Sequence, residues 1–337
     1  MPVPPTLSVL LPVRNGADLL EEAISSLQAQ TFEAFELLAV DDGSTDRTAE
    51  ILREVAGKDP RITVFSQDRL GIVAALEKAR GQARGRYLAR MDADDVSLPH
   101  RFEAQLDLME SDHRIVASGT GVEYFPRTSV RDGALRYEEW LNSLSSHEEI
   151  VRDLFVECPL AHPSLMVRSD VMALVGGYRD LGWPEDYDLV FRLWEGGGRF
   201  GKVPETLLRW REGPDRLSRT HPSYSEEAFR RCKARYLLRS HLAEGRGVVI
   251  GGAGPVGKAF AIELKAQGGK LRAFVDRSPR KQGQEVHGVK VFSPVDAGLF
   301  SAEFHLAAVA QPGAREQIRR DLGALGLQEV AGFVAVA

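Results

Sequence analysis

The sequence has little of several features that would place it in a specialised class of protein. It contains only two cysteines, Cys158 and Cys232, far apart and without a C-x-x-C spacing, which argues against a disulfide framework and a structural zinc site. No run of about 18 apolar residues occurs, so we expect no transmembrane helix. The opening MPVPPTLSVLLPV has neither a basic start nor a long apolar stretch, so we expect no signal peptide. These absences together predict a cytoplasmic protein.

An excess of positive charge is also absent. Lysine and arginine number 43 against 48 aspartate and glutamate, which gives a formal net charge of −5. We therefore expect no nucleic-acid partner. The hydrophobic fraction of 43% and the charged fraction of 27% are those of an ordinary folded protein. At 337 residues, the chain is longer than the usual ~100–200 residues of one domain, which predicts two domains.

Short β-rich runs alternate with amphipathic helical patterns in the first part of the chain. The runs that predict strands are 7–13, 35–40, 61–66 and 86–91. Helical stripes lie between them, the first opened by a capping-box pattern of Asp18 and Glu21. This alternation is typical of an α/β domain with a largely parallel sheet.

Polar turns follow three of the predicted strands. The first strand runs into PVRNGADLL, the second into AVDDGSTDRT with Asp42, and the fourth into ARMDADDVSLPHRF with Asp92, Asp94 and Asp95. Open α/β sheets bind ligands beyond the carboxyl ends of their strands. Mg²⁺ and Mn²⁺ prefer oxygen ligands and share them between a few protein carboxylates, water and substrate phosphates. The D-x-D pair of Asp92 and Asp94 therefore indicates a cation site, whereas helix capping explains only one or two of the three carboxylates, and Asp95 is assigned to the turn.

Four blocks of sequence then resemble family 2 glycosyltransferases, in the same order and with similar spacing. The blocks are VLLPVRNGADLLEEAISSLQAQTF…FELLAVDDGSTDRT, GIVAALEKARGQARGRYLARMDADD, AHPSLMVRSDVMALVGGY and PEDYDLVFRL. The resemblance implies the GT-A fold, in which a nucleotide-binding α/β domain continues into an acceptor-binding region. It also implies transfer of a sugar from a nucleotide diphosphate donor, with inversion at the anomeric carbon.

The resemblance assigns donor-side roles to residues of this chain. Asp42 matches the residue that hydrogen-bonds the base of the donor. Asp92 and Asp94 match the D-x-D that meets the ribose and the metal-bound diphosphate, with Asp94 the better candidate for a direct ligand of Mg²⁺ or Mn²⁺. The first strand and its turn add the further donor-binding candidates Pro12, Arg14 and Asn15, and Arg14 stands where many relatives have an aromatic residue.

Acceptor-side roles follow from the later blocks. Asp186 matches the catalytic base, and Asp188 is a competing candidate. His162 and Glu185 are candidates for the acceptor side, with a purely structural role as the alternative for His162. The segment RWREGPDRLS has Glu212 and Gly213 where many relatives carry a histidine, so we do not expect this loop to assist metal or phosphate binding.

The chain from residue 223 onward differs in character. Residues 223–246 predict a basic connecting helix, opened by a Ser223–Glu226 capping box, which could lie on an anionic membrane surface or be a solvated connector. Its thin apolar stripe favours the connector. At residue 247 the β-α-β pattern restarts, with Gly252, Gly254 and Gly257 directly after a strand and Asp276 ending the next one.

This spacing is that of the dinucleotide fingerprint, in which glycines let a pyrophosphate approach a helix N-terminus and an acid meets the ribose. The unit resembles small Rossmann-like domains attached to sugar-modifying enzymes. Two interpretations stay open for it, a nucleotide or dinucleotide site and a module without a ligand.

The sequence therefore predicts a GT-A domain over 1–222, a connecting helix over 223–246 and a Rossmann-like domain over 247–337. The predicted activity is metal-dependent, inverting transfer from a UDP- or dTDP-sugar to a glycan or lipid-linked acceptor of the cell surface, at the inner face of the membrane. One alternative is an NAD(P)-dependent sugar oxidoreductase that uses the C-terminal domain. The other is a nucleotide-sugar-binding module without catalysis.

Overall fold

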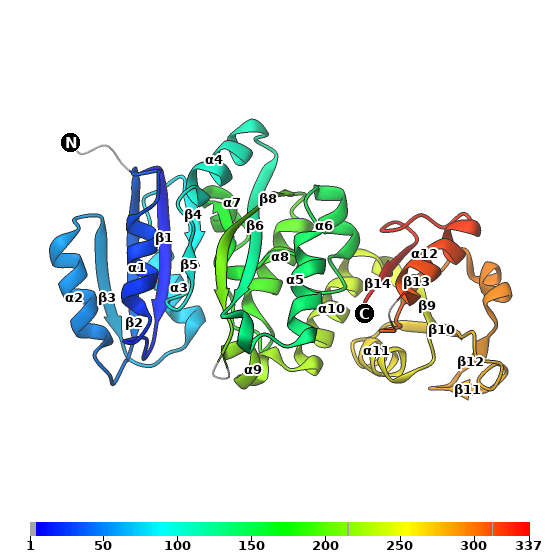
Figure 1. Ribbon diagram of the computed structural model, residues 1–337. Helices are drawn as coiled ribbons and strands as arrows, with labels where there is room; N and C mark the ends of the chain where they lie inside the picture. Colours follow the sequence, from blue (N-terminus) through cyan, green and yellow to red (C-terminus); the bar gives the residue numbers. More distant parts are fainter. Residues whose placement is uncertain (1–4, 214–215, 312) are drawn as a thin grey trace. The chain divides into compact units, whose positions relative to one another are not determined.

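The computed structural model describes residues 5–213, 216–311 and 313–337, which form two compact units (Figure 1). Unit 1 comprises the described residues of Met1–His147, Pro159–Leu181 and Glu185–Thr220, drawn mostly in blue to green. Unit 2 comprises Glu148–Cys158, Gly182–Pro184 and the described residues of His221–Ala337, drawn mostly in yellow to red.

Unit 1 is built on one mixed sheet. Its strands are β1 (Leu7–Val13), β2 (Phe35–Asp42), β3 (Ile62–Gln67), β4 (Tyr87–Arg90), β5 (Val96–Ser97), β6 (Ile115–Phe125), β7 (Met166–Arg168) and β8 (Arg199–Arg211). Its helices are α1 (Leu20–Gln28), α2 (Thr48–Lys58), α3 (Ile72–Arg80), α4 (Arg101–Ser111), α5 (Asp132–Asn142), α7 (Ser169–Leu174), α8 (Glu185–Glu195) and α9 (Leu217–Thr220). The four strands predicted from the sequence are confirmed as β1 to β4.

The strand order in this sheet is β3-β2-β1-β4-β7-β6-β8-β5. Strands β1 to β4 are parallel, whereas β7 runs antiparallel to both β4 and β6. All seven residues of β1 are buried, as expected for the middle of a sheet covered on both faces. The parallel half therefore directs the carboxyl ends of β1, β2 and β4 to one edge.

Helix α1 packs against this core along the stripe that the sequence predicts. Its buried residues are Leu20, Ala23, Ile24 and Leu27. Full burial of one such aliphatic side chain stabilises a fold by roughly 1.5–3 kcal/mol. The predicted Asp18–Glu21 capping box is wrong, because the backbone N–H groups of Leu19 and Leu20 donate instead to the Gly16 carbonyl.

Unit 2 contains a second, smaller sheet. Its strands are β9 (Gly247–Gly251), β10 (Lys270–Val275), β11 (Glu285–Val286), β12 (Val289–Phe292), β13 (Phe304–Ala307) and β14 (Phe333–Ala335), in the order β11-β12-β10-β9-β13-β14. Its helices are α10 (Glu226–Ser240), α11 (Pro255–Ala266) and α12 (Ala314–Ala324), together with α6 (His147–Asp153), most of which lies in this unit. All strand pairs are parallel except β11 with β12.

The predicted connecting helix is α10, and it lies within unit 2. Its cap is Ser225, whose Oγ accepts the Ala228 N–H, so the predicted Ser223–Glu226 capping box is wrong. The helix starts later than predicted because Pro222–Tyr224 form a separate short 3₁₀ turn.

Unit 2 also includes a segment from the middle of the chain, Glu148–Cys158. Asp153 of this segment is buried and pairs with Arg315 and Arg319 of α12. The buried Lys233 of α10 donates to the Val156 carbonyl at 2.7 Å. A truncation near residue 240 would remove both of these arginines together with the rest of α12.

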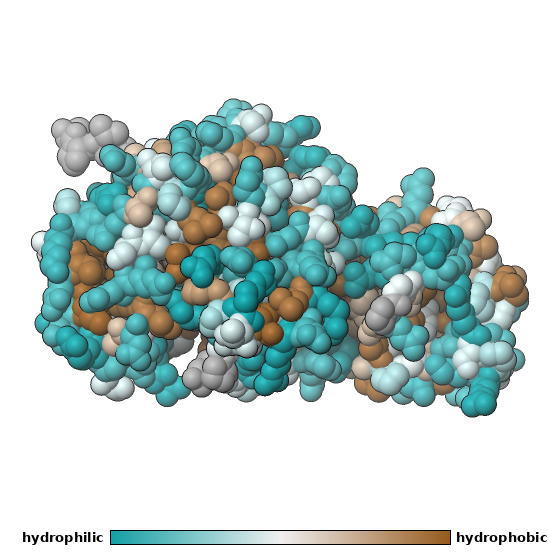
Figure 2. Space-filling model, in the orientation of Figure 1, coloured by the Kyte–Doolittle hydropathy of each residue, from teal (hydrophilic) through white to brown (hydrophobic). Residues whose placement is uncertain are grey.

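Hydrophilic residues cover most of the face drawn in Figure 2, with hydrophobic residues in separate groups between them. Within the described part of the chain, the helices are too short or too polar to cross a bilayer.

The glycines of unit 2 permit a stability test. A Cβ on Gly257 would lie 1.9 Å from the Gly252 carbonyl oxygen, whereas a Cβ on Gly254 would meet nothing within 4 Å. Helix propensity favours alanine over glycine by up to about 1 kcal/mol. A contact of 1.9 Å outweighs that gain, so we expect Gly257→Ala to destabilise unit 2 by about 1–3 kcal/mol.

Hydrogen-exchange mass spectrometry on β9 and α11 measures the effect, with Gly254→Ala as the matched control. Equal protection of these two elements in both variants would contradict the expected clash.

Candidate active site

The strand register of unit 1 brings the predicted polar turns to one edge of the sheet. Val13, the last residue of β1, is opposite Asp41 of β2, and Leu10 is opposite Arg90, the last residue of β4. The turns after β1 and β2 therefore begin side by side, and the turn after β4 begins at the same edge, three residues before the end of β1. This is the edge at which open α/β sheets bind ligands.

The turns after β1 and β2 are fastened to each other by Asn15. Its backbone N–H donates to Ser44 Oγ at 2.9 Å, and its Oδ1 accepts the Thr45 N–H at 2.8 Å. Asn15 has a φ of 51°, a left-handed conformation that asparagine tolerates better than most residues. The predicted donor residue Asn15 thus shapes the edge, while Pro12 is buried in β1 opposite Val40 and Arg14 is exposed.

Asp42 is buried and organises the loop that follows β3. Its Oδ1 accepts hydrogen bonds from Gln67 Nε2 and the Leu70 N–H, both at 2.8 Å, and its Oδ2 accepts the Gly71 N–H at 2.9 Å. Gly71 needs a φ of 92° to present its N–H here, a value that favours glycine. A carboxylate has about four lone-pair positions, so Asp42 retains capacity for one further donor.

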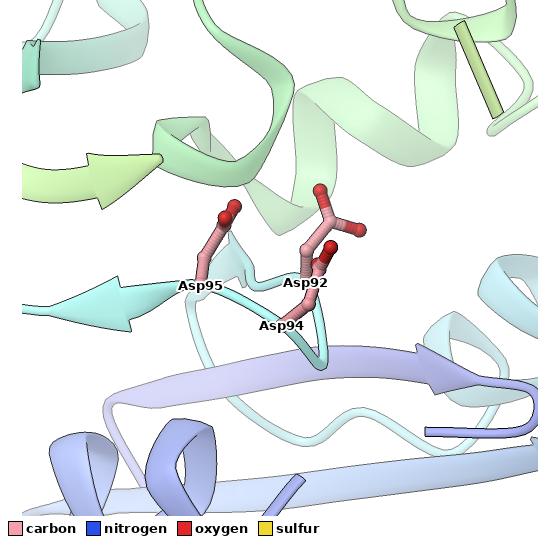
Figure 3. Close-up of side chains that lie close together, drawn as sticks. All are labelled: Asp92, Asp94 and Asp95. Atoms are coloured by element: carbon pink, nitrogen blue, oxygen red, sulfur yellow. The ribbon is translucent and has the colours of Figure 1, made fainter. Parts of the chain in front are cut away.

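Three carboxylate side chains lie close together on the turn after β4 (Figure 3). Asp92, Asp94 and Asp95 each offer an oxygen, and these oxygens lie within 4.8 Å of one another. The Asp95 side chain is almost fully buried, and its Oδ2 has no hydrogen-bond partner in the described structure. Assigning Asp95 to the turn alone was therefore wrong, because its carboxylate belongs to the cluster.

The cluster is electrostatically strained without a counter-ion. Burial, and then the charge of Asp92, raises the pKa of Asp94 to about 6. Burial and the charges of Asp92 and Asp94 hold the pKa of Asp95 well above its usual value. Hard oxygen ligands, mutual repulsion and an unsatisfied buried oxygen all fit a divalent cation such as Mg²⁺ or Mn²⁺.

The sequence did not predict the role of two arginines, Arg211 at the end of β8 and Arg216 in the segment that follows. The Arg211 N–H donates to Asp95 Oδ1 at 2.7 Å, and its Nε donates to the Asp94 carbonyl at 2.6 Å. Arg216 lies over the Trp210 ring at 4.5 Å, and its charge lowers the pKa of Asp94. These contacts place both arginines at the carboxylate cluster, and the only sign of them in the sequence is the repetition of arginine after Trp210. That the loop does not assist metal or phosphate binding stays a prediction.

The acceptor-side candidates form a second cluster in unit 1. His162 Nε2 lies 3.1 Å from the Tyr178 hydroxyl, and His162 Nδ1 lies 3.5 Å from Glu185 Oε1. Burial, and then the charge of Arg90, holds the pKa of His162 well below its usual value. His162 is therefore neutral near pH 7, and its contact with Glu185 is not an ion pair.

Asp186 and Asp188 have different surroundings on α8. Asp188 is fully buried and pairs with Arg192 Nε at 2.7 Å, one helical turn later. The burial of Asp188 and its pairing with Arg192 favour a structural role over that of a base. Asp186 is only partly buried, and its Oδ1 accepts the Tyr187 N–H at 2.7 Å.

The C-terminal candidates lie together in unit 2. Gly252 has a φ of 108°, and Gly254 and Gly257 follow at the start of α11. Asp276, after β10, accepts the Ala253 N–H at 2.8 Å and pairs with Lys281 at 2.9 Å. The predicted ribose-binding acid is therefore already bonded to the glycine-rich turn and to a lysine.

The raised pKa of Asp94 predicts a dependence of stability on pH. Its folded-state pKa of about 6 lies above the usual aspartate pKa of 3.8, so folding takes up protons between these values. The free energy of unfolding therefore falls as the pH rises through this window. At about pH 7.5 and without metal, we expect Asp94→Asn to raise the free energy of unfolding by about 1–3 kcal/mol.

Urea unfolding at about pH 7.5 and about pH 4 measures this difference, which should vanish at the lower pH. Asp18→Asn, on the exposed surface, is the control. A gain for Asp94→Asn that is equal at both pH values would contradict the electrostatic cause.

Comparisons with known proteins identify the family of the chain. A family model described as "Glycosyl transferase family 2" matches residues 8–173. The amylovoran biosynthesis glycosyltransferase AmsE of Erwinia amylovora is 30% identical over 216 residues, which cover 63% of this chain and 78% of AmsE.

Two solved structures share the fold at low sequence identity. S. aureus TarS 1–349 in complex with UDP-GlcNAc has a TM-score of 0.57 at 17% identity, covering 77% of this chain and 71% of TarS. The mannosyltransferase PcManGT of Pyrobaculum calidifontis, in complex with GDP-Man and Mn²⁺, has a TM-score of 0.50 at 19% identity, covering 79% and 70%. The fold is GT-A-like, and the chain belongs to the family 2 glycosyltransferases.

Proposed function

We propose that this glycosyltransferase is metal-dependent and inverting, and that it moves a sugar from a UDP- or dTDP-sugar to a hydroxyl of a glycan or lipid-linked acceptor. We place this step in cell-surface polysaccharide synthesis, at the cytoplasmic face of the membrane. The named role of AmsE in amylovoran biosynthesis and the UDP-GlcNAc bound to TarS support these choices.

The observation that carries the proposal is the carboxylate cluster of Asp92, Asp94 and Asp95. The three carboxylates offer oxygens close enough together to bind one ion, and Asp95 has a buried oxygen without a hydrogen-bond partner in the described structure. These features suit a cation that binds together with a diphosphate. Asp94 and Asp92 are the proposed ligands, and Asp95 completes the set. When bound, the cation neutralises charge that develops on the departing diphosphate.

On the donor side, the chain's own residues bind and orient the nucleotide. Asp42 holds the loop from Gln67 to Gly71 and keeps one acceptor position for an N–H of the base. Asn15 fixes the neighbouring turn. Arg14 is exposed, and its planar guanidinium can stack on a base. Arg216 adds positive charge beside Asp94, where the diphosphate would be held.

On the acceptor side, inversion by a single displacement requires a carboxylate that removes the proton of the acceptor hydroxyl. Asp186 is the proposed base, because it is partly accessible while Asp188 is tied to Arg192. His162, which is neutral, lies in contact with Glu185, and both belong to the sequence blocks that supply the acceptor side. We propose that they orient the acceptor hydroxyl toward Asp186.

A nucleotide site in unit 2 is a second candidate function. The strand order β12-β10-β9-β13-β14 supports this candidate, because it corresponds to the order 3-2-1-4-5 of dinucleotide-binding sheets, whose ligands bind where the strand order reverses, here at the turn after β9. The open space around Gly254 would let a phosphate approach the start of α11. A nucleotide or dinucleotide is the proposed ligand class.

Removing the proposed base should slow the chemical step of sugar transfer and leave the affinity for the nucleotide unchanged. General base catalysis contributes typically ~10²–10⁴-fold, so we expect Asp186→Asn to lower kcat by about that factor while the affinity for the nucleotide is unchanged. Sugar transfer followed by product chromatography measures kcat. Asp188→Asn is the comparison, because it should lower thermal stability through the loss of the Arg192 pair. Wild-type kcat in Asp186→Asn would rule out the base assignment.

Calorimetric titration of the full chain with a panel of nucleotides and nucleotide sugars tests both proposed sites. We expect uridine or thymidine diphosphate to bind with Mn²⁺ present and Asp94→Asn to abolish the Mn²⁺ dependence.

Binding of NAD(P) that Gly254→Val removes and Asp94→Asn leaves intact would locate a second site in unit 2. Dinucleotide-dependent absorbance change without sugar transfer would favour the oxidoreductase alternative. Donor binding without any turnover would favour the non-catalytic module.

A further inference from the structure

We infer that Arg90 is a positioning residue that fixes the carboxylate of Asp92 in the orientation in which it meets the cation and the donor. The inference rests on the proposed function, because it concerns the same cation site. Arg90 itself would touch neither the substrate nor the ion.

Arg90 is a buried cation that makes two hydrogen bonds to the start of the carboxylate turn, which is the turn after β4 that carries Asp92, Asp94 and Asp95. Its side chain is 2% exposed, and its Nη2 donates to Asp92 Oδ1 at 2.5 Å. Its Nη1 donates to the carbonyl of Met91, the residue between them. The planar guanidinium thus fixes a backbone carbonyl and the Asp92 side chain relative to each other, which the single ammonium of lysine cannot do.

Arg90 can orient Asp92 because both the N–H and the carbonyl of its own backbone are hydrogen-bonded. Its N–H donates to the Leu165 carbonyl at 2.8 Å, and its carbonyl accepts Arg101 Nη2 at 2.8 Å. Arg101 is itself fully buried at the start of α4. Arg90 is therefore a fixed point from which Asp92 is oriented.

Stability alone is a poor explanation for this pair. Asp92 is 31% exposed, so water could solvate its carboxylate without any arginine. The Arg90 Nε is buried without a hydrogen-bond partner in the described structure, which costs free energy. The Arg90 side chain also lines a small cavity whose other walls are Tyr178 and apolar residues. An apolar side chain would suit such a site at least as well as a buried charge does.

A positioning role accounts for the same features. The Arg90 Nη2 engages Oδ1 of Asp92 and leaves Oδ2 for a ligand. Partners that orient metal-binding side chains typically matter by 10–100-fold in metal affinity or activity. The arginine charge opposes cation binding, so a test must separate orientation from charge.

Arg90→Lys separates orientation from charge, because it keeps the positive charge and loses the pair of hydrogen bonds to Asp92 and the Met91 carbonyl. The primary readout is the affinity for Mn²⁺ in the presence of UDP, measured by calorimetry on the full chain. We expect Arg90→Lys to weaken Mn²⁺ binding by about tenfold or more, with UDP binding in the absence of Mn²⁺ unchanged. In the background of Asp92→Asn, Arg90→Lys should have no further effect on Mn²⁺ affinity, because Arg90 acts through Asp92.

Arg168→Lys is the matched control. Arg168 is an arginine of the neighbouring β7 that donates to the carbonyls of Ile115 and Met109 and contacts no carboxylate of the cluster. We expect it to lower thermal stability and leave Mn²⁺ affinity unchanged. If Arg90→Lys fails to fold, as judged by circular dichroism, Arg90→Gln replaces it. Because Arg90→Gln also removes a positive charge that opposes cation binding, we expect a smaller loss of Mn²⁺ affinity than about tenfold, and any net loss reports the lost orientation of Asp92.

Wild-type Mn²⁺ affinity in a folded Arg90 variant would overturn the inference, as would an equal loss in Arg168→Lys. An additional loss from Arg90→Lys in the Asp92→Asn background would show that Arg90 does not act through Asp92. A wild-type chain without Mn²⁺-dependent UDP binding would overturn the proposed function and this inference with it.

Discussion

The structure of the site depends on one electrostatic constraint, the repulsion between three carboxylates on a four-residue turn. Asp92, Asp94 and Asp95 have oxygens within 4.8 Å, and burial limits the screening of Asp94 and Asp95 by water. A fold can keep such a turn only by surrounding it with positive charge and fixed N–H groups. Arg90 supplies the first at the start of the turn, and Arg211 supplies the second at Asp95.

The same constraint explains why distant segments meet at this edge. Strand β8 reaches the turn through the pairing of Val96 with Arg209, which places Arg211 beside Asp95. The segment before β7 reaches it through the Arg90 N–H and the Leu165 carbonyl, close to His162. The donor and acceptor candidates of unit 1 are thus tied to the backbone around the carboxylate turn. A binding or catalytic constellation needs such support to keep its geometry.

Much of the fold and part of the site could be predicted because their signals are local. Strands β1 to β4 appear as short apolar runs, and the acidic motifs lie at the end of β2 and just after β4. The two capping boxes failed because turn geometry at Gly16 and at Pro222–Tyr224 moved the helix starts. Asp95 was misassigned because a turn aspartate and a cluster aspartate have the same sequence context, and they differ only in burial.

The sequence by itself determined the α/β alternation, the family and the carboxyl-terminal placement of Asp42, Asp92 and Asp94, since these follow from residues adjacent in the chain. Only the tertiary structure decided which partner each charge has. It paired Asp188 with Arg192, bonded Asp42 to a loop more than twenty residues away, and placed Glu148–Cys158 in unit 2. Burial and long-range contact set these outcomes, because a buried charge must find a partner wherever the fold provides one.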